Sequence, residues 1–350
     1  MVDIDKDNLP NIIDGNVPKN YELCKEGDIV FADASEDTNE VAKAVEYYNL
    51  NGKKVVCGLH TIHGRDNKNK TVVGYKGYAF SSMSFHHQIR RIAQGTKIYS
   101  INTKNFSECY VGIPSKEEQQ KIADLLRLID ERIATQNKII EDLKKLKSAI
   151  IEKVFNGKHS EKLQLNDVGS YIRGLTYSSN DVVEHGGTIV MRSNNIINGS
   201  LLDYNNNVVF VNKQMSAEQQ LQNGDVVICM ANGSSSLVGK SSFYDGSCHS
   251  PITVGAFCGI YRSKEPIVKW LFQTNKYRRY IWNSLQGGNG AIANLNGEDI
   301  LNMSFSIPNA TIKDTCVKML TSVDSALENN MSLCALYTLQ KQHLLRQMFI

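Results

Sequence analysis

The sequence predicts an α+β protein with two globular halves, each followed by one long helix, and with the two helices paired antiparallel as an intramolecular coiled coil. An internal repeat is the first reason, since missing a repeat misassigns the whole fold. Three anchors recur 194 positions later, as from 113 to 307: Ile113-Pro114 as Ile307-Pro308, Ile129-Asp130 as Val323-Asp324, and Phe155 as Phe349. The stretches after both Ile-Pro pairs lack Gly and Pro and carry apolar residues at helical spacing.

The first long helix is expected over residues 115–156. Pro114 disfavours helical geometry in the residue before it, and Ser115 with Glu118 fits a capping box. Asn156-Gly157 is a typical helix end. A helix of this length is a rod of roughly 60 Å, and its apolar stripe needs a second long helix as partner. The stripe comprises Ile122, Leu126, Ile129, Ile133, Ile140, Leu143, Ile150 and Val154.

The second long helix, residues 309–350, carries the matching stripe. We predict a seam through Ile122, Ile129, Gln136, Leu143 and Ile150 of the first helix and Val323, Asn330, Tyr337 and Leu344 of the second. Gln136 and Asn330 are repeat mates, so antiparallel pairing would bring their amides face to face. Two interpretations are open: incidental polar residues at a splayed seam, or a pair that fixes the register at a cost in stability.

The globular halves span residues 1–114 and 157–308, and the repeat continues into them. Gly27-Asp28-Ile29-Val30 matches Gly224-Asp225-Val226-Val227, and Val41-Ala42-Lys43 matches Val238-Gly239-Lys240. Short β-rich runs bounded by Asn, Gly and Ser predict strands at 208–211, 226–230 and 252–261. One helix is expected at Ile267–Leu285.

The two halves are unequal in length. From Leu163 to the second Gly-Asp pair there are 61 residues, against 26 from Met1 to the first pair. About 35 residues that open the second half, beginning near Leu165, therefore have no counterpart in the first. The first half is expected to be a version of the second that is truncated at its N-terminus.

Composition excludes several classes of protein. A net charge of +3 excludes a histone-like polycation but not a DNA reader with local basic patches. The eight cysteines are scattered without a C-x-x-C pair, which predicts reduced thiols in the cytoplasm, with neither disulfides nor a zinc site. No apolar run approaches the ~18 residues of a membrane span.

The sequence contains no complete catalytic motif of the kinds considered below. The segment Gly233 to Gly239-Lys240-Ser241 resembles a P-loop, but five residues separate its glycines where a phosphate-binding loop needs four. The pairs His60/His63 and His86/His87 lack a third metal ligand in sequence and are predicted to be ordinary surface or core histidines. There is no Asn-Pro-Pro-aromatic motif, no glycine-rich methyl-donor motif and no nuclease-like acidic cluster with a following Lys. These absences favour a binding protein over an enzyme.

Several basic and polar residues are candidates for contact with DNA. Cations alternate with aromatics from Lys269 to Trp282, and Phe85-His86-His87 with Arg90-Arg91 holds the corresponding place in the first half. Such stretches grip phosphates and read base edges, or else form an amphipathic helix with the aromatics packed inward. Polar loops supply amides and hydroxyls, although these are also ordinary turn residues. The candidates are Arg192, Asn194, Asn195, Asn232, Ser234, Lys240, Lys276, Arg278, Arg279, Gln286, Asn289, His86, His87 and Arg90.

A family resemblance rests on motifs in the helices and in the second half. Ile113-Pro114-Ser115-x-x-Glu118-Gln119-Gln120-x-Ile122-Ala123, with Leu128-Ile129-Asp130 and Leu143-x-x-Leu146-Lys147, resembles the central region of type I restriction–modification specificity subunits. Leu165-x-Asp167-Val168-(x)4-Arg173-Gly174, followed by Tyr177, is similar to the start of a target-recognition domain, which adds Arg173 and Tyr177 to the candidates.

The resemblance implies a non-catalytic subunit that reads a bipartite double-stranded DNA target through two target-recognition domains. It implies as partners two methylation subunits, which carry S-adenosylmethionine, and restriction/translocase subunits; this chain itself needs no cofactor or metal and contacts no membrane. Asn309-Ala310-Thr311-Ile312-Lys313 departs from the Ser115 motif, so docking at the second helix is expected to differ. The alternatives are a scaffold or silent cassette that no longer reads DNA and, more remotely, a nucleotide-dependent enzyme.

Overall fold

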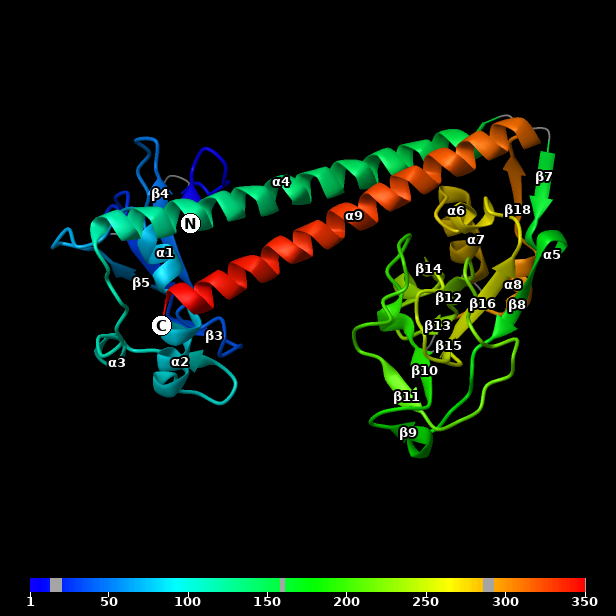
Figure 1. The fold of residues 1–350 in the computed structure, drawn as a ribbon, viewed down its shortest axis with the longest axis horizontal. Helices are drawn as coiled ribbons and strands as arrows, with labels where there is room; N and C mark the ends of the chain where they lie inside the picture. Colours follow the sequence, from blue (N-terminus) through cyan, green and yellow to red (C-terminus); the bar gives the residue numbers. More distant parts are fainter. Residues whose placement is uncertain (13–20, 158–160, 286–292, 350) are drawn as a thin grey trace. The chain divides into compact units, whose positions relative to one another are not determined.

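The protein consists of two compact units, the first built from two separate stretches of chain and the second from one continuous stretch (Figure 1). The structure is a computed structural model and describes residues 1–12, 21–157, 161–285 and 293–349. One unit contains Met1–Ile139 with Asn330–Ile350, and the other contains Ile140–Asn329. None of the helices described has the length and apolarity to cross a membrane.

Two long helices, α4 (Lys116–Phe155) and α9 (Ala310–Met348), contribute to both units. Their bounds agree with the sequence prediction. The hydroxyl of Ser115 accepts a hydrogen bond from the Glu118 backbone N–H at 3.3 Å. In the second helix the Asn309 side chain accepts from the Ile312 N–H at 3.2 Å, so the departure from the serine motif preserves the N-cap.

Within each unit α4 and α9 run antiparallel, as predicted. In the first unit, Lys341 contacts Asp130 at 2.6 Å, and the Gln136 amide donates to the side-chain oxygen of Asn330. In the second unit, Lys147 contacts Asp324 at 2.7 Å. As the residue numbers in α4 increase, the numbers of their contact partners in α9 decrease, which is the antiparallel pattern. The facing amides favour the register-fixing interpretation, because a bonded pair at the seam disfavours slipped alignments.

The seam residues predicted from sequence lie on the inner side of the helices. Ile129, Gln136 and Val323 are buried, and the other six are half-buried. Ile122 and Leu344 pack against buried Leu126 and Phe349 in the first unit. Ile150 packs against the core of the second unit. Each helix therefore ends as part of the core of a unit.

The first unit has a four-stranded sheet in the order β1-β4-β2-β5. Phe31, Phe85 and Ile89 form the centre of its main core. Ser82 is the N-cap of helix α2, and its hydroxyl accepts a hydrogen bond from the Phe85 N–H at 3.3 Å. The elements are β1 (Val2–Asp3), β2 (Ile29–Ala32), β3 (Ala34–Ser35), β4 (Ala44–Asn49), β5 (Thr61–Gly64), α1 (Tyr75–Ala79), α2 (Met83–Ile92), β6 (Tyr99–Ser100) and α3 (Thr103–Phe106).

The second unit opens with elements that precede its Gly-Asp pair. Strand β8 pairs with β16 (Cys258–Ser263), and β10 pairs with β11 and with β15 (Ile252–Val254). These early elements are β7 (Glu161–Gln164), α5 (Leu165–Val168), β8 (Gly169–Arg173), η1 (Ser179–Asp181), β9 (Val182–Val183), β10 (Thr188–Met191), η2 (Ser193–Asn195) and β11 (Val209–Val211).

Its later elements form two four-stranded sheets with the earlier ones, in the orders β14-β12-β16-β8 and β15-β10-β11-β9. They are β12 (Val226–Cys229), β13 (Ala231–Asn232), η3 (Ser235–Leu237), β14 (Ser241–Phe243), β15 (Ile252–Val254), β16 (Cys258–Ser263), α6 (Val268–Leu271), α7 (Asn275–Leu285), β17 (Ala293–Asn294), α8 (Gly297–Leu301) and β18 (Ser304–Ile307).

The single helix predicted over Ile267–Leu285 is wrong, because the structure divides it into α6 and α7. Thr274 lies between them, and its hydroxyl accepts from the Tyr277 N–H at 3.1 Å, which caps a new helix. The single strand expected at 252–261 likewise divides into β15 and β16. Ser, Thr and Asn side chains compete with backbone bonds in this way, which periodicity alone does not register.

The Gly-Asp repeat is a real structural repeat. Gly27 and Gly224 both have positive φ, and the buried Asp after each accepts two hydrogen bonds from an arginine, Arg65 or Arg262. Positive φ is the reason that glycine stands at both positions. In the first unit β2 lies between β4 and β5. In the second unit β12 lies in the same way between β14 and β16. Corresponding residues of these strands and of the Gly-Asp pairs are 197 positions apart in the sequence, as Asp28 and Asp225 are.

Candidate nucleic-acid interface

A cleft in the second unit brings together three residues nominated from sequence. Tyr177, Arg192 and Asn232 line a cavity of about 450 Å³. Ser178, Ser179, Ser193 and Gly233 also line it. Tyr177–Ser179 and Arg192-Ser193 come from the segment before Gly224, and Asn232 and Gly233 from the segment after it.

The loop after β12 holds Asn232 at the edge of this cleft. Strand β13 pairs with β17, and the Asn232 side chain accepts from the Ser234 N–H at 3.0 Å. Its amide also donates to the Ser193 hydroxyl at 3.3 Å. Arg192 directly follows strand β10 and is exposed, with one hydrogen bond from Nη2 to the Asn207 carbonyl at 3.3 Å. A guanidinium has five N–H donors, so Arg192 keeps donors for a ligand.

Phe257 is a cleft residue that the sequence analysis missed. Its side chain is 65% exposed, between β15 and β16, and it lines the cleft with Arg192. The Met230 and Ala231 N–H groups both donate to its carbonyl, which fixes the turn. A large aromatic side chain exposed beside polar donors suits stacking or contact with a thymine methyl group. No periodic sequence pattern marks Phe257 as exposed, because a single Phe between two apolar strands looks like a residue of the hydrophobic core.

A second cleft, also of about 450 Å³, is lined by the following part of the same loop, Ser235–Lys240. Lys240 and Arg278 line it, together with Ser235, Ser236 and Trp282. Trp282 is 64% exposed, so the aromatics of this stretch are not all packed inward. Asn232 and Gly233 line the first cleft, and Ser234 follows them in the loop between the clefts.

The other candidates in this unit are placed differently. Arg173 and Asn194 are exposed but line neither cleft, and Arg279 is exposed on α7. Lys276 is half-buried, with its ammonium over the rings of Tyr280 and Phe305 at 5.8 and 5.6 Å. Its position supports packing more than ligand contact. Gln286 and Asn289 lie outside the described residues.

Asn195 is corrected to a structural residue. Its side chain is only 1% exposed, accepts from the Arg192 N–H at 2.9 Å and donates to the carbonyls of Asp203 and Asn206. Because the amide oxygen and nitrogen of Asn195 are hydrogen-bonded within the protein, they are not available to contact a base. It instead fixes the turn that carries Arg192. The neighbouring Asn194 looks the same in sequence, so only the fold separates them.

In the first unit the basic candidates lie on α2. His87 and Arg90 are exposed, and His86 is half-buried. Burial lowers the pKa of His86 below its usual 6.5, and the adjacent Arg90 lowers it further. Its imidazole is therefore neutral at pH 7 and contributes no cation. This leaves His87 and Arg90 as the accessible polar groups among these three candidates.

The P-loop alternative fails on structure. A phosphate-binding loop leads into a helix, whose N-terminus faces the phosphate. Here Lys240-Ser241 leads into β14, and a 3₁₀ turn at Ser235–Leu237 precedes it. Gly239 has positive φ, and a Cβ there would lie 2.7 Å from Ile281 of α7. The glycine is required by packing, which removes the argument for a nucleotide enzyme.

The chain matches the family model described as type I restriction modification DNA specificity domain, over residues 7–145 and 158–333. It is 33% identical over 158 residues to the type I restriction enzyme EcoKI specificity subunit of Escherichia coli K12, covering 42% of this chain and 31% of that protein. The StySPI specificity subunit of Salmonella potsdam is 32% identical over 156 residues, with the same coverage. The chain thus aligns with about a third of the length of these relatives.

The fold is also similar to solved structures. The type I restriction–modification S subunit from M. genitalium superposes with a TM-score of 0.61 at 16% identity, covering 95% of this chain and 84% of that one. A chain from a structural study of complex assembly and conformational transition of the type I R-M system gives a TM-score of 0.52 at 14% identity, with the same coverage. The matched family model covers most of both halves, and this chain belongs to the type I restriction–modification DNA specificity family.

Proposed function

We propose that this chain is the DNA sequence-specificity subunit of a type I restriction–modification complex and has no catalytic activity of its own. The first cleft carries the proposal. It combines an exposed guanidinium, a positioned carboxamide and two aromatic rings, and these are the groups that distinguish base pairs in the major groove. Arginine suits guanine, asparagine suits adenine, and an aromatic ring suits the thymine methyl group.

The second cleft is proposed to hold the DNA backbone. Lys240 and Arg278 supply positive charge, and Ser235 and Ser236 supply hydroxyls. Phosphate contacts of this type fix the position of a protein on the duplex without reading sequence. The loop between the clefts would then couple backbone contact to base contact. In the first unit, His87 and Arg90 are proposed to approach a second part of a bipartite target.

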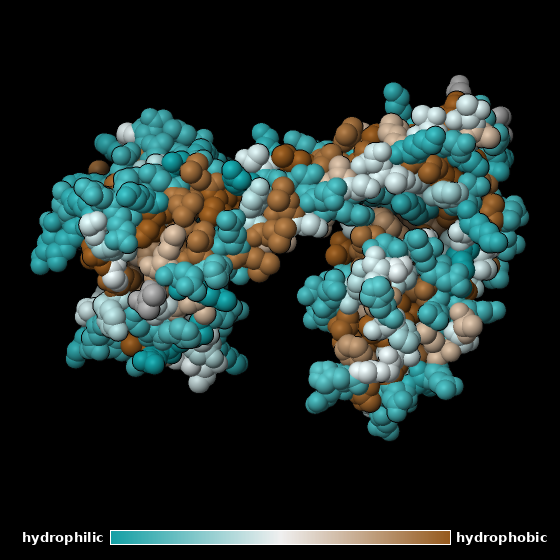
Figure 2. Space-filling model, in the orientation of Figure 1, coloured by the Kyte–Doolittle hydropathy of each residue, from teal (hydrophilic) through white to brown (hydrophobic). Residues whose placement is uncertain are grey.

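The outer sides of the long helices are proposed to bind the methylation subunits, which carry S-adenosylmethionine and modify adenine, with restriction/translocase subunits joining the complex in the cytoplasm. Figure 2 shows hydrophobic side chains at the surface along these helices. In the first unit, Leu336 and Leu339 of α9 are 62% and 60% exposed. Leu125, Leu128 and Leu333 are also exposed there. Apolar side chains gathered at a surface in this way mark a protein interface.

Changing Leu336 and Leu339 to Glu should weaken assembly with the methylation subunits at least tenfold, because burying an unpaired charge at an apolar contact is costly. Co-purification and calorimetric titration with those subunits measure this. The matched control is Gln340→Glu, an exposed position on the same helix, which should leave assembly unchanged. Equal assembly of both proteins would place the interface elsewhere.

Alanine at Arg278 should lower DNA affinity by a similar factor for all sequences. A lost phosphate contact reduces the slope of log affinity against log salt by about one unit. Arg279→Ala is the matched comparison, because Arg279 is exposed on the same helix but does not line the cleft. A salt slope that is unchanged in Arg278→Ala would remove this arginine from the DNA interface.

Site selection tests the proposed function. The full chain, assembled with its methylation subunits, is incubated with random duplex DNA, and retained molecules are sequenced. We expect enrichment of one split motif. Assembly without any enriched motif would support the scaffold alternative and contradict a specificity role.

A further inference from the structure

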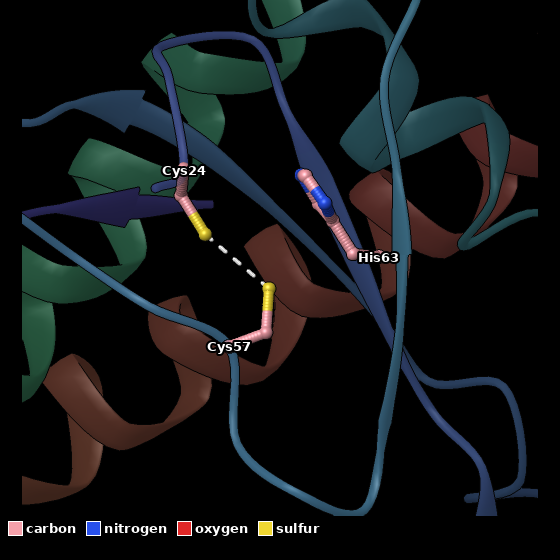
Figure 3. Close-up of side chains that lie close together, drawn as sticks. All are labelled: Cys24, Cys57 and His63. Carbon is pink, nitrogen blue, oxygen red and sulfur yellow. Dashed lines mark hydrogen bonds between the residues drawn. The ribbon is translucent and has the colours of Figure 1, made fainter. Parts of the chain in front are cut away.

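Three potential metal ligands meet in the first unit, from segments far apart in sequence (Figure 3). The sulfur atoms of Cys24 and Cys57 are 3.2 Å apart, and a ring nitrogen of His63 lies within 4.8 Å of both. The expectation that His63 lacks further ligands is therefore wrong. Sequence spacing does not show the cluster, because the strands bring its members together.

The fold holds each member in place. The Cys24 N–H donates to the Val55 carbonyl at 2.9 Å, and Leu23 bridges to Val56, next to Cys57. His63 lies on β5, paired with Val30 of β2. Cys24 is buried, and Cys57 and His63 are half-buried. Three segments thus converge with their ligand atoms already close together.

A buried carboxylate orients the imidazole. The Asp28 Oδ2 lies 2.9 Å from His63 Nε2, and Arg65 donates two hydrogen bonds to the same carboxylate. Because the carboxylate accepts the Nε2 proton, Nδ1 carries the free lone pair. Histidines that bind metals commonly donate their other N–H to a carboxylate in this way. The Glu22 carboxylate lies nearby, with Oε2 3.7 Å from Nδ1 and Oε1 accepting a hydrogen bond from Arg65.

The repeat shows what the fold itself requires at these positions. The residues 197 places later are Leu221, Val254 and Ile260, and all three are buried in one apolar core. The local structure corresponds: the Leu221 N–H donates to Ile252 as that of Cys24 does to Val55, and Ile260 pairs with Val227 as His63 does with Val30. Apolar side chains therefore satisfy this architecture, and two thiols with an imidazole are not demanded by it.

We propose that Cys24, Cys57 and His63 Nδ1 bind Zn²⁺ in the first unit, with the Glu22 carboxylate as the fourth ligand. Two thiolates and an imidazole in a tetrahedral arrangement are typical zinc ligands. Zn–S bonds of about 2.3 Å place tetrahedral sulfurs about 3.8 Å apart, so the thiols need to separate by about 0.6 Å. The ion would join the segments before β2, before β5 and within β5, and its binding energy would stabilise the unit.

The repeat also supplies the test variant. Cys24→Leu, Cys57→Val and His63→Ile together install the residues of the second unit and remove every ligand but Glu22. Full-length protein is purified with reductant and zinc, freed of loose metal, and analysed by elemental mass spectrometry. We expect about one zinc per chain in the natural protein and in the control Cys109→Ser, and none in the triple variant. Chelation should lower the melting temperature of the first two proteins but not of the third.

Two measurements on the natural sequence do not depend on whether the triple variant folds. Cobalt(II) in place of zinc should give a thiolate-to-metal charge-transfer band, and zinc should protect Cys24 and Cys57 from alkylation while leaving Cys109 reactive. Absence of zinc with unprotected thiols would overturn the proposal. So would a Cys24–Cys57 disulfide that forms readily in the presence of zinc, which would identify a redox pair. DNA binding enters none of these measurements, so the site stands or falls apart from the proposed function.

Discussion

Replacing Asp324 with alanine should destabilise the second unit by about 3–5 kcal/mol, the usual cost of leaving one member of a buried ion pair alone. Asp324 accepts from Lys147 at 2.7 Å and from the Trp270 indole at 3.0 Å. The two charged side chains are only 8% and 6% exposed. Burial lowers the pKa of Lys147, and Asp324 opposes that effect. Without the carboxylate, a buried ammonium loses its main partner.

The repeat provides the control for this experiment. Asp130 holds the equivalent place in the first unit, bonded to Lys341 and to the Tyr78 hydroxyl, but its pair with Lys341 is about a third exposed. Asp130→Ala should cost about 1 kcal/mol, because solvent screens such a pair. Urea unfolding followed by circular dichroism reports both units, and the fluorescence of Trp270 and Trp282 reports the second unit. The double change Lys147→Met with Asp324→Leu should recover most of the loss; no recovery would show that packing, not charge, is responsible.

Alanine at Arg192 should reduce base discrimination by about 1–3 kcal/mol at one position of the DNA target, the value of a bidentate contact to a base edge. Arg192 is exposed at the end of β10 and lines the cleft beside Asn232 and Phe257. Losing a base contact should lower the affinity for the preferred DNA sequence far more than the affinity for DNA with another base at that position. Arg278→Ala, in contrast, is expected to lower the affinity for all sequences by a similar factor. Competition binding of the assembled complex against single-base variants of its site measures the difference.

Arg173→Ala is the matched control for Arg192, because Arg173 is exposed in the same unit but lines neither cleft. We expect no position-specific loss from it. If both arginine variants discriminate bases alike, the first cleft does not read DNA, and the reading surface must be sought elsewhere on the unit.

The long helices were predictable from sequence because their signal is local and repeated. Apolar spacing, the Ser115 cap and the repeat offset together gave the bounds of α4, the antiparallel pairing and the facing of Gln136 with Asn330. Helix α7 was harder to bound, since Thr274 interrupts the apolar pattern with a capping hydroxyl. Local competition of this kind depends on geometry that periodicity does not encode.

The candidate sites were less predictable because they depend on long-range pairing. Residue type nominated Arg192 and Asn232, but it nominated Asn195 equally, and only burial separates them. Phe257 resembles a core residue until its turn exposes it. Cys24 and His63 become neighbours through strand pairing. An alignment of the two halves at the offset of 197 distinguishes Cys24 and His63, because the residues that correspond to them, Leu221 and Ile260, are apolar.

The most direct test of a DNA specificity role is to map methylated adenines in cells that carry the intact system and in cells that lack only this gene. The account predicts that a split motif is modified in the first cells and unmodified in the second. A copy carrying Arg192→Ala should relax one position of one part of that motif and leave the other part unchanged. Identical methylation maps with and without the gene would contradict the account.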